Sequence, residues 1–378
     1  MKTIQLGILI SLCITATVSS QTVQFERQKI ASESYESVGV ADLNGNGHLD
    51  IISGEYWYEG PDFLDRHFVG QIERQSQYWD DFAAIIMDVN GNGRMDVISG
   101  GWFSEALFWR ENPGDNSGWE KHIIDQTGNV ETARAWDVDG DGYPEIVPNN
   151  PNDPLKFYKL ERDGNGNATG IFQKYPVADA QGHGLGFGDI NGNGRGDFVV
   201  SNGWLESPAD HNDGTWTLHE EFDFGSASIP ILVVDVNGNG KNDLIVGQAH
   251  SYGLHWYEQT TDESGNREWN EHPIDPFSSQ FHTMEWADID GDGNNELVTG
   301  KRYRAHNGND PGANDPLGLY YYKWNGKSFV KHTIASGPFG TGKGTGIYFS
   351  VKDLNESGYK DIIVAGKDGL YVFINKGF

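Results

Sequence analysis

Two histidines occupy the same position relative to a repeated acidic motif. His183 lies six residues before the copy that begins at Asp189, and His282 lies six residues before the copy that begins at Asp288. Histidine can take up or release a proton near neutral pH, so it is a natural general base or acid. Glycines flank His183 and leave room for a ligand beside its ring. We therefore expect both histidines to transfer protons in a site.

Basic and phenolic side chains are expected on the same face of the molecule. The segment KRYR is the densest basic cluster of this acidic chain, and it contributes Arg302 and Tyr303 to the longest inserted loop. Arg134 lies three residues after Glu131, which shares the register of His183. Arginine can hold a carboxylate through two hydrogen bonds, and tyrosine can act as a general acid. Arg134, Arg302 and Tyr303 complete the expected catalytic set.

Further side chains are expected to contact a bound ligand on this face. Histidines outside the repeated strand positions would supply hydrogen bonds, and tryptophans that follow a strand would supply surfaces for stacking. The expected substrate-binding residues are Glu131, His211, His250, His306, Lys301, Lys343, Trp57, Trp102 and Trp204. A different set of histidines shares one position on the fourth predicted strands and is expected to be structural, namely His67, His122, His219, His272 and His332.

The repeated motif itself has the ligand spacing of a calcium loop. Oxygen-bearing side chains stand at its positions 1, 3, 5 and 9, and Ca²⁺ binds carboxylate, amide and backbone oxygens. Two copies carry acids at all four positions and are the expected structural calcium sites: Asp137, Asp139, Asp141 and Glu145, and Asp288, Asp290, Asp292 and Glu296. The alternative is a tight turn that needs no ion, because Asn-Gly and Asp-Gly favour the positive φ angles of such turns.

The spacing of the motif predicts the fold that would position these residues. Seven copies begin at Asp42, Asp88, Asp137, Asp189, Asp235, Asp288 and Asp353. A period of about fifty residues with four strand-like segments is typical of a β-propeller blade. The seventh copy lacks a fourth strand, and FERQKIA near the N-terminus shares the pattern of the fourth strand FVKHTIA. We therefore predict an all-β, seven-bladed propeller whose ring is closed by the N-terminal strand.

The composition restricts the location and the partners of the protein. Residues 1–20 combine Lys2, an apolar run and small residues, which is typical of a secretory signal peptide. Residues 21–378 are predicted to form a single propeller domain in a periplasmic or secreted protein. The only cysteine, Cys13, lies in the signal peptide, so the exported protein would have no disulfide and no thiolate ligand. The formal charge of −28 argues against nucleic acid as a partner, and we expect a monomer without membrane insertion.

The repeats D-x-[DN]-G-[DN]-G-x-x-[DE] resemble those of the FG-GAP/VCBS propeller families, although the seventh copy departs from the pattern at Glu356 and Ser357. A narrower resemblance lies in HGLGFGDINGNGRGDFVVSNGW, VGQAHSYGLHWYEQ and TGKRYRAHNGNDPGANDPLGLY. These segments are similar to the propeller of aldos-2-ulose and anhydrofructose dehydratases. They are also similar to secreted dehydratases and lyases that act on uronic-acid oligosaccharides, including ulvan fragments. The resemblance implies elimination chemistry on sugars.

The expected function combines these residues with that resemblance. A base would remove the proton at C5 of a uronic acid in an acidic oligosaccharide, and an acid would protonate the leaving oxygen at C4, giving a 4,5-unsaturated product. Arg302 would neutralise the sugar carboxylate, and a divalent metal ion held by histidines is the alternative to arginine. The rival prediction is a carbohydrate-binding or adhesion propeller without catalysis, whose polar groups only line a water-filled channel.

Overall fold

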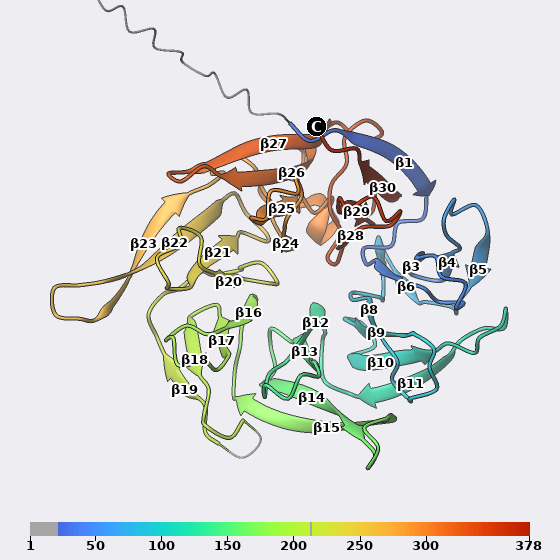
Figure 1. The fold of residues 1–378 in the computed structure, drawn as a ribbon, viewed down its shortest axis with the longest axis horizontal. Helices are drawn as coiled ribbons and strands as arrows, with labels where there is room; N and C mark the ends of the chain where they lie inside the picture. The colour runs from blue at the N-terminus through green and yellow to red at the C-terminus, as the bar shows by residue number, and fades with distance from the viewer. Residues whose placement is uncertain (1–21, 212–213) are drawn as a thin grey trace, which may run out of the picture.

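The computed structural model describes residues 22–211 and 214–378, so the predicted signal peptide lies outside the described residues. Seven four-stranded antiparallel sheets are arranged as blades around a central axis (Figure 1). This arrangement confirms the predicted all-β, seven-bladed propeller. The strand β1 (Phe25–Ala31) is the outer strand of the seventh blade, where it pairs with β30 (Leu370–Asn375). Within the described residues, no helix is long and apolar enough to cross a membrane.

In blades one to six the strands run in chain order from an inner strand at the axis to an outer strand at the rim, and in blade seven the N-terminal β1 takes the outer position. Blade one contains β2 (Gly39–Ala41), β3 (Asp50–Ser53), β4 (Tyr56–Tyr58) and β5 (Arg66–Phe68), and blade two contains β8 (Ile85–Met87), β9 (Asp96–Gly101), β10 (Ala106–Glu111) and β11 (Glu120–Asp125). Blade three contains β12 (Thr132–Trp136), β13 (Glu145–Asn149), β14 (Leu155–Arg162) and β15 (Ala168–Ala178). Blade four contains β16 (Leu185–Gly188), β17 (Asp197–Val200), β18 (Gly203–Glu206) and β19 (Thr217–His219). Blade five contains β20 (Leu232–Val234), β21 (Asp243–Gly247), β22 (Leu254–Thr261) and β23 (Arg267–Pro273). Blade six contains β24 (Met284–Ala287), β25 (Glu296–Gly300), β26 (Leu317–Trp324) and β27 (Phe329–Gly337). Blade seven contains β28 (Ser350–Lys352), β29 (Asp361–Val364), β30 and β1. Two insertions add the hairpin of β6 (Arg74–Gln75) and β7 (Tyr78–Trp79) and the short 3₁₀ helix η1 (Ala305–Gly308).

The burial of each strand depends on how much of it the adjacent blades cover. The second strands are covered on both faces by adjacent blades, so they are apolar runs such as DLIVG in β21, where every residue is buried. The outer strands alternate between covered and exposed residues, as in EKHIID of β11. The core therefore lies between the blades, where Val199 of β17 and Leu244 of β21 belong to one buried cluster. This packing holds the inner strands rigidly around the central channel.

The repeated histidines of the outer strands pack inside the blades, as predicted. Trp57 stacks on His67 with ring centroids 4.0 Å apart, and Trp204 stacks on His219 at 4.2 Å. The two tryptophans are 6% and 2% exposed. This corrects the prediction that Trp57 and Trp204 contact a ligand, because they lie within the third strands β4 and β18 and face a histidine of the same blade.

The motif turns that carry asparagine satisfy their own polar groups. The first aspartate accepts backbone N–H groups of the turn, as Asp189 does from Gly192 and Gly194 at 2.7 and 2.8 Å. The amide of the third residue donates to a glutamate of the third strand. These pairs are Asn90 with Glu111, Asn191 with Glu206, and Asn237 with Glu258. Turn chemistry alone therefore explains why this sequence recurs.

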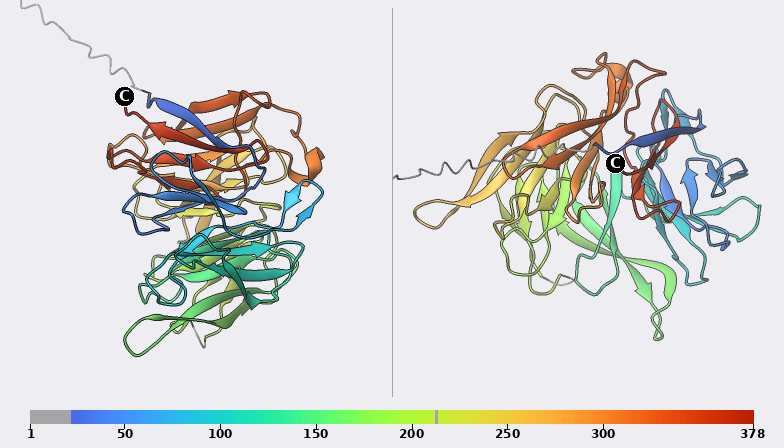
Figure 2. Two further views of the ribbon diagram at one scale, coloured as in Figure 1. Left: turned by 90° about the vertical axis from the view of Figure 1, so that its right-hand side faces the viewer. Right: turned by 45° about the horizontal axis from the view of Figure 1, so that its top comes forward.

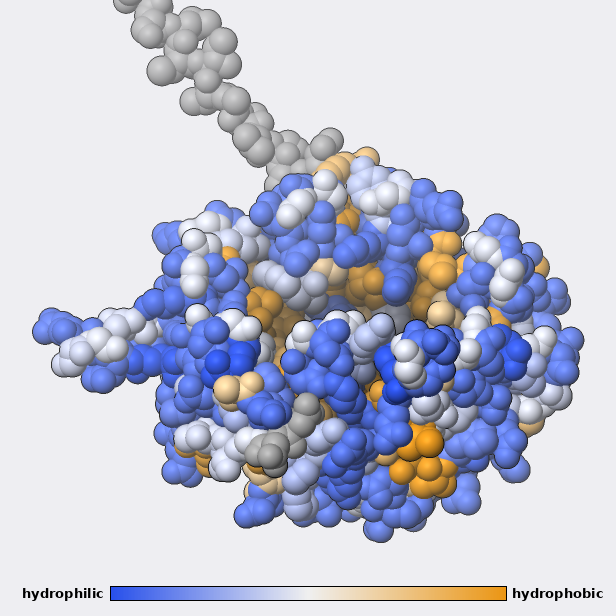
Figure 3. All heavy atoms as spheres, turned by 60° about the horizontal axis from the view of Figure 1, so that its bottom comes forward, coloured by the Kyte–Doolittle hydropathy of each residue, from blue (hydrophilic) through white to orange (hydrophobic). Residues whose placement is uncertain are grey.

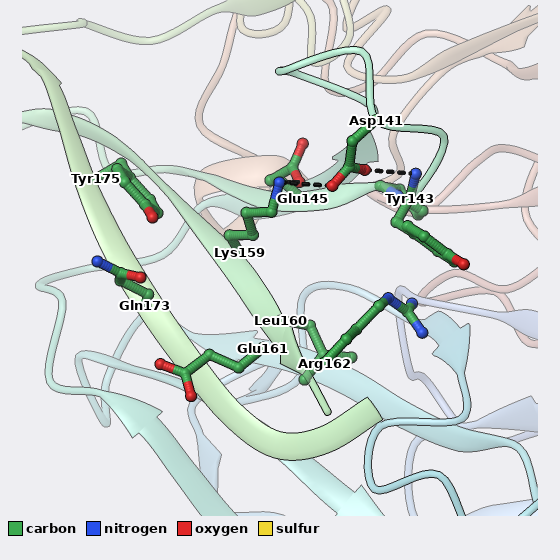
Figure 4. A pocket seen from close by; sticks show the side chains of 10 residues that line it. Asp141, Tyr143, Glu145, Lys159, Leu160, Glu161, Arg162, Gln173 and Tyr175 are labelled. Atoms are coloured by element: carbon green, nitrogen blue, oxygen red, sulfur yellow. Dashed lines mark hydrogen bonds and ion pairs between the residues drawn. The ribbon is translucent and has the colours of Figure 1, made fainter. Parts of the chain in front are cut away.

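The two all-acid turns contain a lysine where a cation would bind. Lys159 of β14 contacts Asp139 and lies 2.6 Å from Asp141 (Figure 4), and Lys323 of β26 occupies the same position in the other turn. Burial opposes the lysine charge, but the hydrogen bonds that the ammonium groups donate to the carboxylates raise the pKa of both lysines, so each ammonium group stays charged. Calcium binding in these turns remains a prediction, and it would require displacement of the ammonium group.

Lys323→Met is expected to make the stability of its turn depend on calcium. Methionine removes the charge but keeps an unbranched side chain, so Asp290, Asp292 and Glu296 would face one another without a cation. Binding to the folded state then stabilises by mass action. Thermal unfolding should show a Tm that rises on addition of Ca²⁺ in the variant and hardly changes in the wild type. An equal rise in both proteins would show that calcium already displaces the lysine.

Buried acids at position nine of the motif predict how stability depends on pH. Asp96 accepts the backbone N–H groups of Val89 and Asn112. Burial raises its pKa to about 6, and it raises the pKa of Glu145 and Glu296 to about 7. Such groups have a pKa of about 4 in an unfolded chain, so the folded state binds protons more tightly and loses stability as the pH rises through these values. Acidification from about pH 7.5 to about pH 6 should raise the Tm of the wild type relative to that of Glu296→Gln, which lacks one of these acids, and a Tm difference that stays constant over this range would contradict the assignment.

Candidate active site

Four blades place a titratable side chain at the same position, six residues before the motif. These residues are Glu36, Glu131, His183 and His282. All four precede the inner strand of their blade, so the propeller brings them to one mouth of the central channel. Glu131 Oε1 lies 2.9 Å from His282 Nε2 and 3.7 Å from His183 Nε2. The shared register therefore produces a cluster of histidine and carboxylate side chains.

His250 joins this cluster from the loop that follows β21. Its Nε2 lies 3.1 Å from His183 Nε2, and its ring centroid lies 5.4 Å from that of His282. The rings of His183 and His282 are themselves 5.1 Å apart. The inner strands therefore converge closely enough for side chains from alternate blades to meet.

Hydrogen bonds at the outer ring nitrogens leave the facing nitrogens free. His183 Nδ1 donates to the carbonyl oxygen of Ala227 at 2.9 Å, and His250 Nδ1 donates to the carboxylate of Asp310 at 3.0 Å. A neutral imidazole that is protonated at Nδ1 carries a lone pair at Nε2. The two Nε2 lone pairs therefore face each other at 3.1 Å, an arrangement that a cation between them would stabilise.

Burial keeps His250 and His282 neutral, whereas Glu131 stays ionised. Burial lowers the pKa of His250 to about 4 and holds the pKa of His282 well below its ordinary value. Burial alone would raise the pKa of Glu131, but the hydrogen bond from His282 and the charge of Arg302 hold it well below the ordinary value. Neutral imidazoles with a carboxylate are a ligand set that zinc and other divalent transition metals favour.

These side chains can together hold a divalent metal ion. The ligand atoms of Glu131, His183, His250 and His282, here called the histidine–glutamate cluster, all lie within 4.8 Å of one another. Hydrogen bonds from the outer nitrogen to a carbonyl or a carboxylate are those that orient metal-binding histidines in proteins. The facing lone pairs and the donor set therefore both fit a metal ion.

Arg302 is buried, which corrects the prediction that it is exposed for a substrate carboxylate. The residue is 3% exposed, and its Nε and Nη1 donate to Glu36 and Glu131 at 2.9 Å each. Lys367 lies 3.3 Å from the same Glu36 carboxylate. Two internal carboxylates thus satisfy the guanidinium, and its role is to position Glu131 beside the histidines.

Three other predicted cations are also paired inside the protein. Lys301 donates to two backbone carbonyls of its own inserted loop, and Lys343 pairs with Asp368. Arg134 reaches across the central channel beneath the cluster and donates to Thr283. None of these three cations is more than 6% exposed. This corrects their expected role in contacting substrate at this site, because internal acceptors bind these buried cations, apart from the Nε–H of Arg134, which has no acceptor among the described residues.

A pocket of about 250 Å³ opens beside Glu131. Aromatic side chains form one part of its lining and polar side chains form the other: Tyr78, Phe82, Trp102, Phe103, Glu131, Arg302, His306 and Asn307. A sugar ring has an apolar face and a polar edge, so a lining divided in this way suits it. Of the tryptophans predicted to stack on a ligand, Trp102 lies in this pocket.

Two residues of the site lie outside the repeated pattern and could not be found from it. Tyr78 belongs to the hairpin of β6 and β7, and Asp310 belongs to the inserted loop of blade six. Asp310 orients two histidines, because it accepts from His250 Nδ1 and, at 2.8 Å, from His306 Nδ1. The hairpin and the helix η1 project from the same face of the propeller (Figure 2). The length of the two insertions was the only sequence feature that distinguished them.

The backbone around His306 is strained. Arg304, His306 and Asn307 have φ angles of 56°, 46° and 57°. These left-handed values cost non-glycine residues roughly 1–3 kcal/mol each, and such strain clusters at functional sites. Contacts with the hairpin support it, since Ser76 donates to the Asn307 side chain and the Tyr78 hydroxyl accepts from the Asn307 N–H. The strain therefore fixes His306 at the edge of the pocket.

Two predicted residues lie away from the cluster. The ring of Tyr303 stacks on Phe339 with centroids 5.6 Å apart and does not line the pocket described above. The ring of His211 lies 5.7 Å from that of Trp216 in the loop before β19. Tyr78 therefore takes the position in the pocket that the sequence suggested for Tyr303.

Comparison with known sequences identifies the repeat. Residues 88–148, 137–200 and 235–299 match the FG-GAP-like repeat. This match confirms the resemblance that the motif indicated. No curated protein matches the sequence at a significant level.

Solved structures show that other chains share this propeller fold. The exotype rhamnogalacturonan lyase YesX aligns with a TM-score of 0.53 and 13% identity over 91% of this chain and 72% of that chain. A crystal structure of BBS1N in complex with ARL6DN, soaked with lead, aligns with a TM-score of 0.54 and 10% identity over 93% of this chain and 96% of that chain. At such identities the similarity shows the fold alone.

Proposed function

We propose that this FG-GAP-repeat propeller is an exported carbohydrate lyase or dehydratase that acts on acidic oligosaccharides such as ulvan fragments. The reaction would eliminate water or a sugar across C4 and C5 of a uronic acid and leave a 4,5-unsaturated product. The observation that carries the proposal is the convergence of the histidine–glutamate cluster beside an aromatic pocket. A lyase among the proteins with this fold agrees with the reaction class.

The elimination requires a base and an acid on either side of the sugar. The C5–H bond breaks and its electrons form the C4=C5 double bond, while the C4–O bond breaks and the leaving oxygen takes a proton. His306 suits the base, because its Nδ1 donates to Asp310 and its Nε2 lone pair is then free at the pocket. Tyr78 suits the acid, because burial raises the pKa of its phenol and keeps it protonated.

The histidine–glutamate cluster would hold a divalent ion such as Zn²⁺, which would bind the sugar carboxylate and make the C5–H more acidic. The chain supplies the orientation of this site. Ala227 and Asp310 fix two of the imidazole rings, and Arg302 fixes Glu131. Such outer contacts set the direction of each ligand atom before any substrate binds.

The local charge would attract an acidic sugar only when a metal ion is bound. Arg302 and Lys367 offset the charges of Glu36 and Glu131, and the buried histidines are neutral. A divalent ion would make this point positive within a protein whose formal charge is −28. The aromatic lining beside it, which includes Trp102, would stack on the apolar face of the sugar.

Mass spectrometry of uronic-acid oligosaccharides incubated with the metal-loaded protein tests this function. A dehydratase product has lost one water and keeps every sugar residue, whereas a lyase divides the oligosaccharide. Binding of the oligosaccharide without either product would favour a non-catalytic carbohydrate-binding propeller. Absence of both binding and product with all uronic acids tested would reject the proposal.

A further inference from the structure

A second pocket, of about 350 Å³, lies in the central channel on the side of the motif turns. Side chains from three blades supply its charged groups and aromatic rings: Arg134, Trp136, Phe187, Glu285 and Trp286. Hydrophobic side chains line the walls of a hollow at the centre of the ring in the space-filling view (Figure 3). The Arg134 guanidinium separates this lower pocket from the active site, since it donates to the Ile229 carbonyl and the Thr283 hydroxyl across the channel.

Two opposite charges stand at one repeat position in the lower pocket. Arg134 precedes its motif by three residues, and so does Glu285. The equivalent residues of the other blades are uncharged: Gly39, Ile85, Gly186, Leu232 and Ser350. Five blades thus form without a charge here, so the fold does not require this pair.

Both charged groups have hydrogen-bonding capacity that the described part of the chain leaves unused. Arg134 is 6% exposed, and its Nε–H is buried without an acceptor among the described residues. No described residue hydrogen-bonds the carboxylate of Glu285, and burial raises the pKa of this group to about 7. Buried polar groups in native proteins nearly always have a protein, water or ligand partner. Glu285 is partly exposed, so the buried Nε–H of Arg134 is the group that indicates a polar occupant, and Glu285 lines the same pocket.

Aromatic rings surround the charged pair. Trp136 and Phe187 stack with ring centroids 5.8 Å apart, and Trp286 lines the pocket from blade six. All three rings are partly exposed rather than fully covered by the core. Aromatic faces beside a few polar groups form the surface that binds a pyranose ring, which has an apolar face and a hydroxylated edge.

We propose that the lower pocket is a second, non-catalytic site that binds one neutral sugar residue. A sugar hydroxyl can accept from Arg134 Nε–H and a neighbouring hydroxyl can donate to Glu285, while the C–H face stacks on Trp136 or Trp286. Internal acceptors already bind Arg134 Nη1 and Nη2, so its Nε–H alone could meet the carboxylate of a uronic acid and could not hold it bidentately, whereas the ionised form of Glu285 would repel it. The lower pocket would therefore select neutral sugars, whereas the active site selects acidic ones, and the inference stands independently of the proposed function.

Saturation-transfer NMR with methyl β-D-glucopyranoside and methyl β-D-glucuronide tests this site. The wild type should transfer saturation to the ring protons of the neutral glycoside. The glucuronide should bind this site more weakly than the neutral glycoside, with a larger dissociation constant. Glu285→Leu removes the hydrogen-bond acceptor, and Trp286→Ala removes a stacking surface. Each variant should bind the neutral glycoside at least ~10-fold more weakly than the wild type, which is the effect of losing one hydrogen bond to a charged group. His306→Ala changes only the other pocket and should bind the neutral glycoside like the wild type.

Glu285→Leu and Trp286→Ala test the same site, so the proposal can still be tested if one of these two variants does not fold. A folded Glu285→Leu or Trp286→Ala protein that binds the neutral glycoside as tightly as the wild type would overturn the proposal. Absence of saturation transfer in the wild type, or tighter binding of the glucuronide that persists in His306→Ala, would also overturn it. The channel would then hold only water.

Discussion

His183→Ala is expected to lose bound zinc and elimination activity together while the propeller remains folded. This imidazole contributes one Nε2 to the histidine–glutamate cluster, and its bond to Ala227 fixes the ring. Replacing a group that merely orients a metal ligand costs ~10–100-fold in metal affinity or activity, so loss of a ligand should cost at least ~100-fold. Elemental analysis of the purified variant and the rate of vinyl-proton formation in NMR spectra measure both effects on one sample.

His48→Ala is the matched control, because His48 is an exposed histidine of a motif turn. It should keep the metal content and the rate of the wild type. Thermal unfolding of both variants shows whether a loss of activity reflects a loss of structure. A folded His183→Ala protein with wild-type metal content and full turnover would contradict the assignment of the cluster.

Tyr78→Phe is expected to stop elimination without releasing the metal. Phenylalanine keeps the ring that lies near Phe82 and Phe103 and beneath Lys367, but it removes the phenolic O–H. Loss of a general acid typically costs ~10²–10⁴-fold in rate. His306→Ala removes the proposed base and should cause a loss of the same order. The measurements are the metal content and the rate of product formation at saturating substrate.

Tyr252→Phe provides the control for Tyr78→Phe. Tyr252 is an exposed tyrosine whose hydroxyl donates to Asp315 at 2.6 Å, and its replacement should leave the rate unchanged. If Tyr78→Phe keeps its metal and His183→Ala loses it, then Tyr78 acts in proton transfer and His183 acts in metal binding. Full activity in Tyr78→Phe would assign the acid to another group, and loss of metal would make Tyr78 a support of the cluster.

The fold and the convergence of the cluster could be predicted because both depend on the repeat. Each blade joins its inner and second strands through the same kind of turn, so residues at one offset from the motif lie at equivalent points around the axis. The common offset of His183, His282 and Glu131 from the motif therefore indicated that they meet. The lysines of the all-acid turns could also have been found, since Lys159 and Lys323 stand on third strands where other copies carry glutamate.

The remaining parts of the site depend on contacts between insertions, which no repeat describes. Tyr78 and Asp310 are placed by loops whose conformation rests on one another, as the hydrogen bond between Ser76 and Asn307 shows. The burial of Arg302 was missed for a related reason, because its two carboxylate partners come from other blades. A basic cluster in an acidic sequence indicated a ligand-binding surface, whereas in the folded chain it balances internal acids.

The proposed reaction requires a metal ion held by the histidine–glutamate cluster. An NMR time course of a uronic-acid oligosaccharide tests this requirement with the protein as purified, after removal of metal by a chelator, and after return of Zn²⁺. A new vinyl proton signal should form with the purified protein, form at least ~100-fold more slowly with the stripped protein, and return to its first rate on addition of zinc. A vinyl signal that forms equally fast in the stripped protein, or that never forms with the zinc-loaded protein, would contradict it.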